Sequence, residues 1–119
     1  MKKIYALVAG LLLNVNTAFA DQGVETGKII TILVHHATPV AGVESQRIAF
    51  TLDGTKTGGL CESNAKEEWL IYLDSEAGKA QYSTVLAAYM SDKTISVYGN
   101  LTAECYGGGE VVRNIRLTK

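Results

Sequence analysis

The histidines and cysteines of this sequence are its residues best suited to hold a transition metal, but their spacing argues against a site. His35 and His36 are adjacent, so in an extended chain their side chains point to opposite faces and do not share one ion. Cys61 and Cys105 would need two further ligands, and no C-x-x-C or H-x-x-x-H spacing supplies them. The sequence therefore predicts neither a metal ion nor another cofactor.

Nucleophilic and acid–base catalysis also lack a recognisable arrangement. No G-x-S-x-G turn presents a serine to a neighbouring base. The carboxylates of Glu67, Glu68 and Glu110 are interpreted as solvated loop acids. The three glycines at 107–109 lack the lysine and hydroxyl residue of a phosphate-binding loop, and they precede a strand pattern instead of a helix. We therefore predict that the protein is not an enzyme.

Residues 1–20 have the composition of a bacterial secretory signal peptide. Lys2 and Lys3 precede an apolar stretch at 4–13, and the segment ends on an A-x-A cleavage pattern. The apolar stretch is shorter than the roughly 20 residues that span a bilayer core. We expect export to the periplasm or the medium, no membrane insertion, and a single mature domain at 21–119.

Charge and cysteine content narrow the class of partner. The chain has 11 basic and 12 acidic side chains, and cleavage would remove Lys2 and Lys3, leaving a net charge of −3. This balance provides no electrostatic footprint for nucleic acid or for an anionic membrane. Because disulfides persist in exported proteins, we predict one bond between Cys61 and Cys105, worth about 4 kcal/mol in the chain-entropy model.

Hydrophobic periodicity predicts five strands and one helix. Alternating apolar residues separated by turn residues mark the strands, and a period near 3.6 marks the helix, which Asp74 or Ser75 caps. On the helix, Tyr82, Leu86 and Tyr89 form the stripe expected to face the core, and Val85 and Met90 flank it. The predicted strands are 26–36, 47–54, 69–74, 94–99 and 110–119, and the predicted helix is 76–91.

Three strands, one helix and two strands form the element order of the OB-fold, a five-stranded Greek-key barrel. We therefore predict a mainly β, OB-fold-like barrel over 21–119, with the helix between the third and fourth strands and one disulfide. An α+β sheet with the helix packed across one face has the same element order and stays the alternative, because periodicity does not report barrel closure.

The aromatic residues divide into core and surface positions. Trp69 falls on an inward position of its strand, whereas Tyr72, Tyr98 and Tyr106 fall on outward or loop positions. A tyrosine at the surface offers both a ring that stacks on a sugar and a hydroxyl group. OB-folds bind sugars or single strands through one exposed face, and the negative net charge favours a sugar or a protein over nucleic acid.

Several segments together resemble a family of small exported bacterial proteins related to the binding (B) subunits of subtilase-type AB toxins. They are TGKI, RIAFTLDG, EEWLIYLDSEAGKAQYSTVLAAYMSDKTISVYG and EVVRNI, with one cysteine after the second segment and one after the third. The most specific parts are W-x-I-x-L, the helix with L-A-A-Y, and the glycine-ended strand before the second cysteine. The resemblance implies an OB-fold with a disulfide and, for toxin members, a homopentamer that recognises host glycans and carries a catalytic A subunit.

The same resemblance suggests where a ligand would bind. In the toxin subunits a hydroxyl residue just ahead of the first strand helps to hold sialic acid, and the matching position here is Thr26, where serine is usual, with Lys28 close by. With Tyr106, these are the candidate ligand-binding residues. Our hypothesis is a non-catalytic exported module that binds host cell-surface glycans, and the alternative is a monomeric periplasmic protein with an envelope or stress-related binding role.

Overall fold

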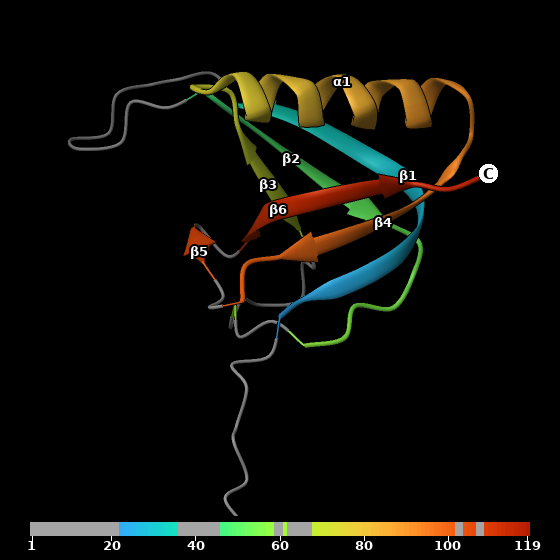
Figure 1. The fold of residues 1–119 in the computed structure, drawn as a ribbon, viewed down its shortest axis with the longest axis horizontal. Helices are drawn as coiled ribbons and strands as arrows, with labels where there is room; N and C mark the ends of the chain where they lie inside the picture. The colour runs from blue at the N-terminus through green and yellow to red at the C-terminus, as the bar shows by residue number, and fades with distance from the viewer. Residues whose placement is uncertain (1–21, 36–45, 59–60, 62–67, 102–103, 107–108) are drawn as a thin grey trace, which may run out of the picture.

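The structure, a computed structural model, describes residues 22–35, 46–58, 61, 68–101, 104–106 and 109–119. The predicted signal peptide at 1–20 lies outside these residues, as do His36 and Glu67. The elements in chain order are β1 (Val24–His35), β2 (Arg47–Leu52), β3 (Trp69–Tyr72), α1 (Glu76–Met90), β4 (Thr94–Gly99), β5 (Cys105–Tyr106) and β6 (Gly109–Leu117) (Figure 1).

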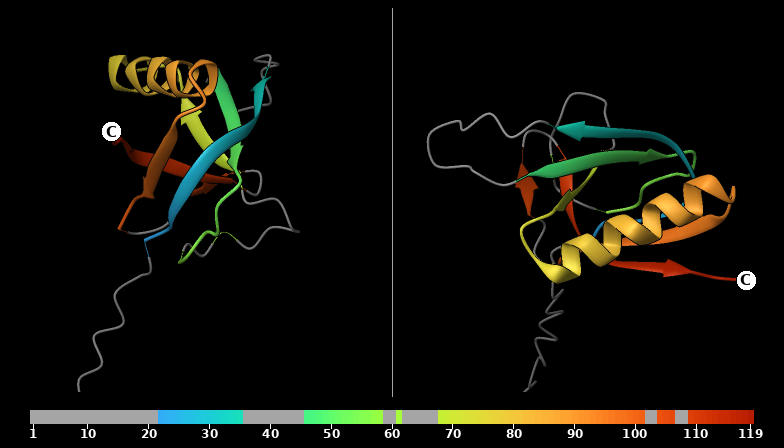
Figure 2. Two further views of the ribbon diagram at one scale, coloured as in Figure 1. Left: turned by 90° about the vertical axis from the view of Figure 1, so that its right-hand side faces the viewer. Right: turned by 90° about the horizontal axis from the view of Figure 1, so that it is seen from above.

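The main strands close into a barrel. The sheet order is β3-β2-β1-β4-β6-β5, and a parallel pairing of β3 with β6 closes the five main strands, with β5 attached beside β6. β1 is long and strongly curved, since residues 29–35 pair with β2 and residues 24–28 pair with β4 (Figure 2). Closure confirms the predicted barrel, with the helix between the third and fourth strands, and rules out the open α+β sheet.

The two-residue strand β5 is an addition to the predicted elements. It pairs with the start of β6 at Cys105↔Glu110 and Tyr106↔Gly109. A pattern of two residues has no detectable period, so the sequence predicts only a connection here. The other predicted elements are present, with boundaries shifted by a few residues.

The core lies inside the barrel and beneath α1, which crosses one end of it in Figure 1. Trp69 and Phe50 are its largest buried side chains, and Trp69 therefore occupies the predicted core position. Ser75 caps the helix, as expected, by accepting a hydrogen bond from the Gly78 backbone N–H at 3.0 Å. Within the described residues, no helix is long and apolar enough to cross a membrane.

The predicted inward stripe of α1 is correct only for Val85 and Tyr82, which pack in or against the core. Val85 and Ala88 are buried, whereas Leu86 and Tyr89 are exposed and Tyr82 is only partly buried. The buried face also includes a glycine at the start of the helix, so it is formed by small residues that let the helix backbone approach the strands. Periodicity weights large apolar side chains and therefore selects the wrong face of a helix that packs through small ones.

Candidate functional site

A polar surface covers the outer side of β1, β4 and β6. Side chains alternate along these strands, so Glu25 and Gly27 are buried while Thr26 and Lys28 are exposed. Register places Thr26 opposite Ser96, and Ser96 opposite Arg116, which makes one row across three strands. We call this surface the polar face, and its residues are Thr26, Lys28, Ser96, Tyr98, Asn114 and Arg116.

Two hydroxyl groups meet at the centre of the polar face. The Thr26 Oγ1 and Ser96 Oγ atoms lie 2.8 Å apart and form a hydrogen bond in which either can be the donor. Each hydroxyl keeps further donor or acceptor capacity for a ligand. Thr26 came from the resemblance, but Ser96 was missed, because only the register between β1 and β4 brings it to Thr26.

Lys28 lies on the polar face and is paired with an acidic residue. Its Nζ atom donates a hydrogen bond to Asp92 Oδ2 at 2.8 Å. This hydrogen bond, together with the charge attraction of Asp92, raises the pKa of Lys28 above its ordinary value of 10.5. Asp92 follows α1 in the left-handed region, with φ of 53°. The ammonium group is therefore charged at neutral pH and anchored to the turn after the helix.

The polar face continues into an open cleft along β6. The Arg116 guanidinium carbon lies 5.7 Å from the centroid of the Tyr98 ring, a cation–π contact that holds both side chains beside the cleft. At its edge, Gln81 Nε2 of α1 donates a hydrogen bond of 2.9 Å to the Arg113 carbonyl. The cleft has a volume of about 600 Å³, and its polar lining is Gln22, Gln81, Tyr98, Arg113, Asn114 and Arg116.

The predicted disulfide is present, and it lies beside the start of β6, whereas the polar-face residues of β6 are near the end of that strand. Cys61 is bonded to Cys105 of β5, which pairs with the start of β6, whereas Thr26 pairs with β4. The backbone of Tyr106 belongs to β5, but its side chain lies outside the described part of the structure. The backbone pairing thus does not unite Tyr106 with Thr26 and Lys28.

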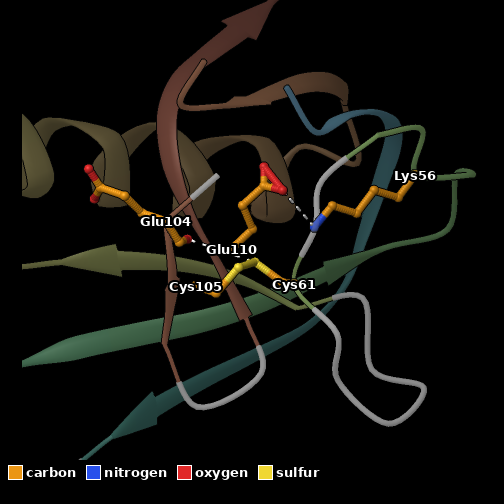
Figure 3. The surroundings of a disulfide bond; sticks show 5 residues. All are labelled: Lys56, Cys61, Glu104, Cys105 and Glu110. Atoms are coloured by element: carbon orange, nitrogen blue, oxygen red, sulfur yellow. Dashed lines mark hydrogen bonds and ion pairs between the residues drawn. A yellow bond between two sulfur atoms is a disulfide. The ribbon is translucent and has the colours of Figure 1, made fainter. Parts of the chain in front are cut away.

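A charged cluster is buried inside the barrel on the other side of the sheet from the polar face. Glu110 is fully buried and forms an ion pair with Lys56, at 3.4 Å between Oε1 and Nζ (Figure 3). The same Nζ atom lies 4.2 Å from the Trp69 ring centroid, and Trp69 Nε1 donates a hydrogen bond of 2.7 Å to buried Glu25. The interpretation of Glu110 as a solvated acid is therefore wrong, because closure of the barrel encloses the start of β6.

Gly99 makes room for the buried carboxylate. A Cβ atom at this position would overlap Glu110 Oε2, and one at Gly23 would overlap the same group. Gly99 N–H also donates a hydrogen bond to the Gly23 carbonyl at 2.9 Å. The two glycines therefore enclose the side chain of Glu110 with backbone.

Substitution of Gly99 by alanine is expected to lower the free energy of unfolding by about 2 kcal/mol, because overpacking a filled core is destabilising. Urea denaturation of the mature protein measures this change. When Glu110 is also alanine the overlap is gone, so Gly99→Ala should then cost less than about 0.5 kcal/mol. If Gly99→Ala lowered the free energy of unfolding equally in the wild type and in the Glu110→Ala variant, the overlap with the Glu110 carboxylate would not be the cause.

Within the described residues, no group of three or more histidine, cysteine, aspartate or glutamate side chains is placed to hold a metal ion. The structure instead presents the polar face, a surface of hydroxyl, amide, aromatic and cationic groups. The ion pair of Lys56 and Glu110 is buried inside the barrel. Comparison of the chain with models of known families, with curated proteins and with solved structures finds no match.

Proposed function

We propose that this protein is a non-catalytic, exported carbohydrate-binding module whose site is the polar face. The observation that carries the proposal is the hydroxyl pair of Thr26 and Ser96, 2.8 Å apart and exposed on the same face as Tyr98. Hydroxyl groups that donate and accept match those of a sugar, and a tyrosine ring stacks on the apolar side of a sugar ring. The resemblance to toxin B subunits, with Thr26 at the glycan position, supports the same function.

The distribution of carboxylates favours binding over hydrolysis. Glycoside hydrolysis uses a pair of carboxyl groups on either side of the scissile bond. Here Glu25 and Glu110 are enclosed in the core. The two carboxylates beside Lys28 are both bonded to it, Asp92 to its Nζ atom and Asp53 to its backbone N–H. A sugar on the polar face would therefore meet hydroxyl, amide and cationic groups, and within the described residues the acids beside Lys28 are already bonded to it.

Export is part of the proposal. The Cys61–Cys105 bond is compatible with an oxidising compartment, and the signal-like segment at 1–20 supplies the route.

Assembly into a homopentamer, with a catalytic subunit if the protein acts as a toxin component, is supported by two incompletely paired strand edges. In the described residues, β1 beyond Lys28 has no strand on its β4 side, and β6 beyond Val111 has none on its β3 side. Ile30 and Val34 are exposed beside the first edge. Exposed edges favour pairing with another chain, and two different edges on one subunit join copies head to tail, as in a ring.

The carbohydrate proposal is tested by the variants Thr26→Val and Ser96→Ala on a glycan array, followed by titration with the best ligand. Each variant removes a hydroxyl from the pair and is expected to weaken binding about tenfold, close to the contribution of one hydrogen bond that is lost with its partner left unpaired. Thr51→Val on β2 is the matched control and should bind as the wild type does. Unchanged binding in both test variants would exclude the polar face.

Light scattering of the mature protein gives the number of copies per particle, which distinguishes the homopentamer from a monomeric periplasmic protein. Five copies per particle would support a toxin-like binding subunit. A strict monomer would exclude the ring and favour the periplasmic protein with an envelope or stress-related binding role.

A further inference from the structure

The cleft along β6 concentrates positive charge in a chain that has more acidic than basic residues. Arg113 and Arg116 both line it and are both exposed. Lys28, Lys56 and Lys79 form ion pairs with acidic residues, whereas neither arginine of the cleft is in an ion pair within the described residues. The two guanidinium groups therefore enter the cleft without a carboxylate partner from the described part of the chain.

The walls of the cleft are held in place by hydrogen bonds. Gln22 Nε2 donates to the Gly99 carbonyl at 2.7 Å, and Gln81 Nε2 donates to the Arg113 carbonyl at 2.9 Å. The contact with the Tyr98 ring limits where the Arg116 guanidinium lies. A guanidinium held in this way binds a planar or tetrahedral oxyanion with little further loss of side-chain freedom.

The position of the cleft defines the length of the ligand. Arg116 lies one inter-strand spacing, about 5 Å, from Ser96, whereas Arg113 lies three residues away from Arg116 along β6, a distance of about 10 Å. This separation exceeds the width of one sugar ring. An acidic group that reaches Arg113 therefore belongs to a different sugar unit from the one that contacts the Thr26–Ser96 pair.

We propose that Arg113 and Arg116 form a second subsite, which binds the sulfate or carboxylate of an acidic oligosaccharide at a sugar unit adjacent to the one held by Thr26 and Ser96. The inference rests on the proposed function, since it takes the sugar at Thr26 as given. The hydroxyl, amide and aromatic groups that continue from Thr26 to the cleft favour a saccharide over an acidic peptide, whose backbone would offer fewer hydroxyl partners.

The test is an NMR titration of the mature protein at constant ionic strength with three disaccharides, one neutral, one carboxylated and one sulfated, and with sodium sulfate and a glutamate-rich peptide as further probes. The acidic disaccharides should shift the backbone amide signals of residues 113–116 and bind at least tenfold more tightly than the neutral one. The comparison of the two acidic disaccharides identifies which oxyanion the cleft prefers.

The variant Arg113→Gln/Arg116→Gln should reduce the binding of the acidic disaccharide about a hundredfold and leave the neutral one unchanged. The variant Lys79→Gln/Lys119→Gln makes the same change in net charge at exposed positions that do not line the cleft and should bind as the wild type does. Heat denaturation of each variant checks that the fold is retained.

The outcomes separate this inference from the proposed function. Binding that depends on Thr26 but not on the arginines overturns the second subsite and leaves the carbohydrate site in place. Binding of the acidic disaccharide that depends on the arginines but not on Thr26 supports the cleft and excludes the hydroxyl pair. The acidic oligosaccharide is excluded as the ligand if sodium sulfate shifts the amide signals of residues 113–116 while no disaccharide does. It is also excluded if the glutamate-rich peptide binds more tightly than every disaccharide.

Discussion

Replacement of Cys61 and Cys105 by serine is expected to lower the free energy of unfolding by about 4 kcal/mol. The bond joins residues separated by 44 positions, and its loss frees a loop of that length in the unfolded chain. In the folded state β5 is held to β6 by two residue pairs, so few contacts replace the covalent bond. Small domains are stable by about 5–15 kcal/mol, and urea denaturation should therefore show a large fall in the midpoint.

Reduction of the wild-type protein by a dithiol provides the matched measurement. It should cause the same loss of stability as the double substitution, and it should have no effect on the variant that lacks both thiols. Alkylation of the native, unreduced protein should modify neither cysteine by mass spectrometry. A loss smaller than about 1 kcal/mol would mean that other contacts already restrain this loop.

Substitution of Lys56 by methionine is expected to lower the free energy of unfolding by about 3 kcal/mol. Its side chain is 9% exposed and that of Glu110 is completely buried, so the change leaves a carboxylate in the core without its cationic partner. The carboxylate oxygens of Glu110 accept no hydrogen bond within the described residues, so little else compensates the buried charge. Urea denaturation measures the loss.

A double variant tests whether the isolated charge is the cause. Lys56→Met combined with Glu110→Met replaces the ion pair by apolar side chains of similar length and should restore most of the lost stability, because such replacements are often neutral or stabilising. Lys79→Met, which breaks an exposed pair with Glu76, is the control and should change stability by less than about 0.5 kcal/mol. If the double variant were as unstable as Lys56→Met, the shape of the side chains and not the unpaired charge of Glu110 would account for the loss of stability.

The buried cluster also bears on the polar face, because neighbouring residues on a strand point to opposite sides. Glu25 is held by Trp69 inside the barrel while the next residue, Thr26, is on the outside. Gly99 contacts Glu110 inside, and the residue before it, Tyr98, contacts Arg116 outside. The interior contacts therefore position the backbone that presents the proposed binding residues.

The sequence by itself determined the five main strands, the helix and the covalent bond. Alternation predicted the strands that were found from Arg47 to Leu52 and from Thr94 to Gly99, and a capping serine with a 3.6-residue period predicted α1. These are local properties, since each depends on neighbours within a few positions. The two cysteines left one pairing, so their bond needed no knowledge of the fold.

Only the tertiary structure decided which residues meet. Thr26 and Ser96 are 70 positions apart, and register between strands, which no local pattern encodes, places their hydroxyl groups together. Closure of the barrel turned Glu110 from a predicted loop acid into a buried partner of Lys56. Packing against the strands buries Ala88 of the helix and leaves Tyr89, which was predicted to face the core, exposed. Each of these outcomes depends on long-range contacts between elements, and so the binding face could be identified only after the elements were assembled.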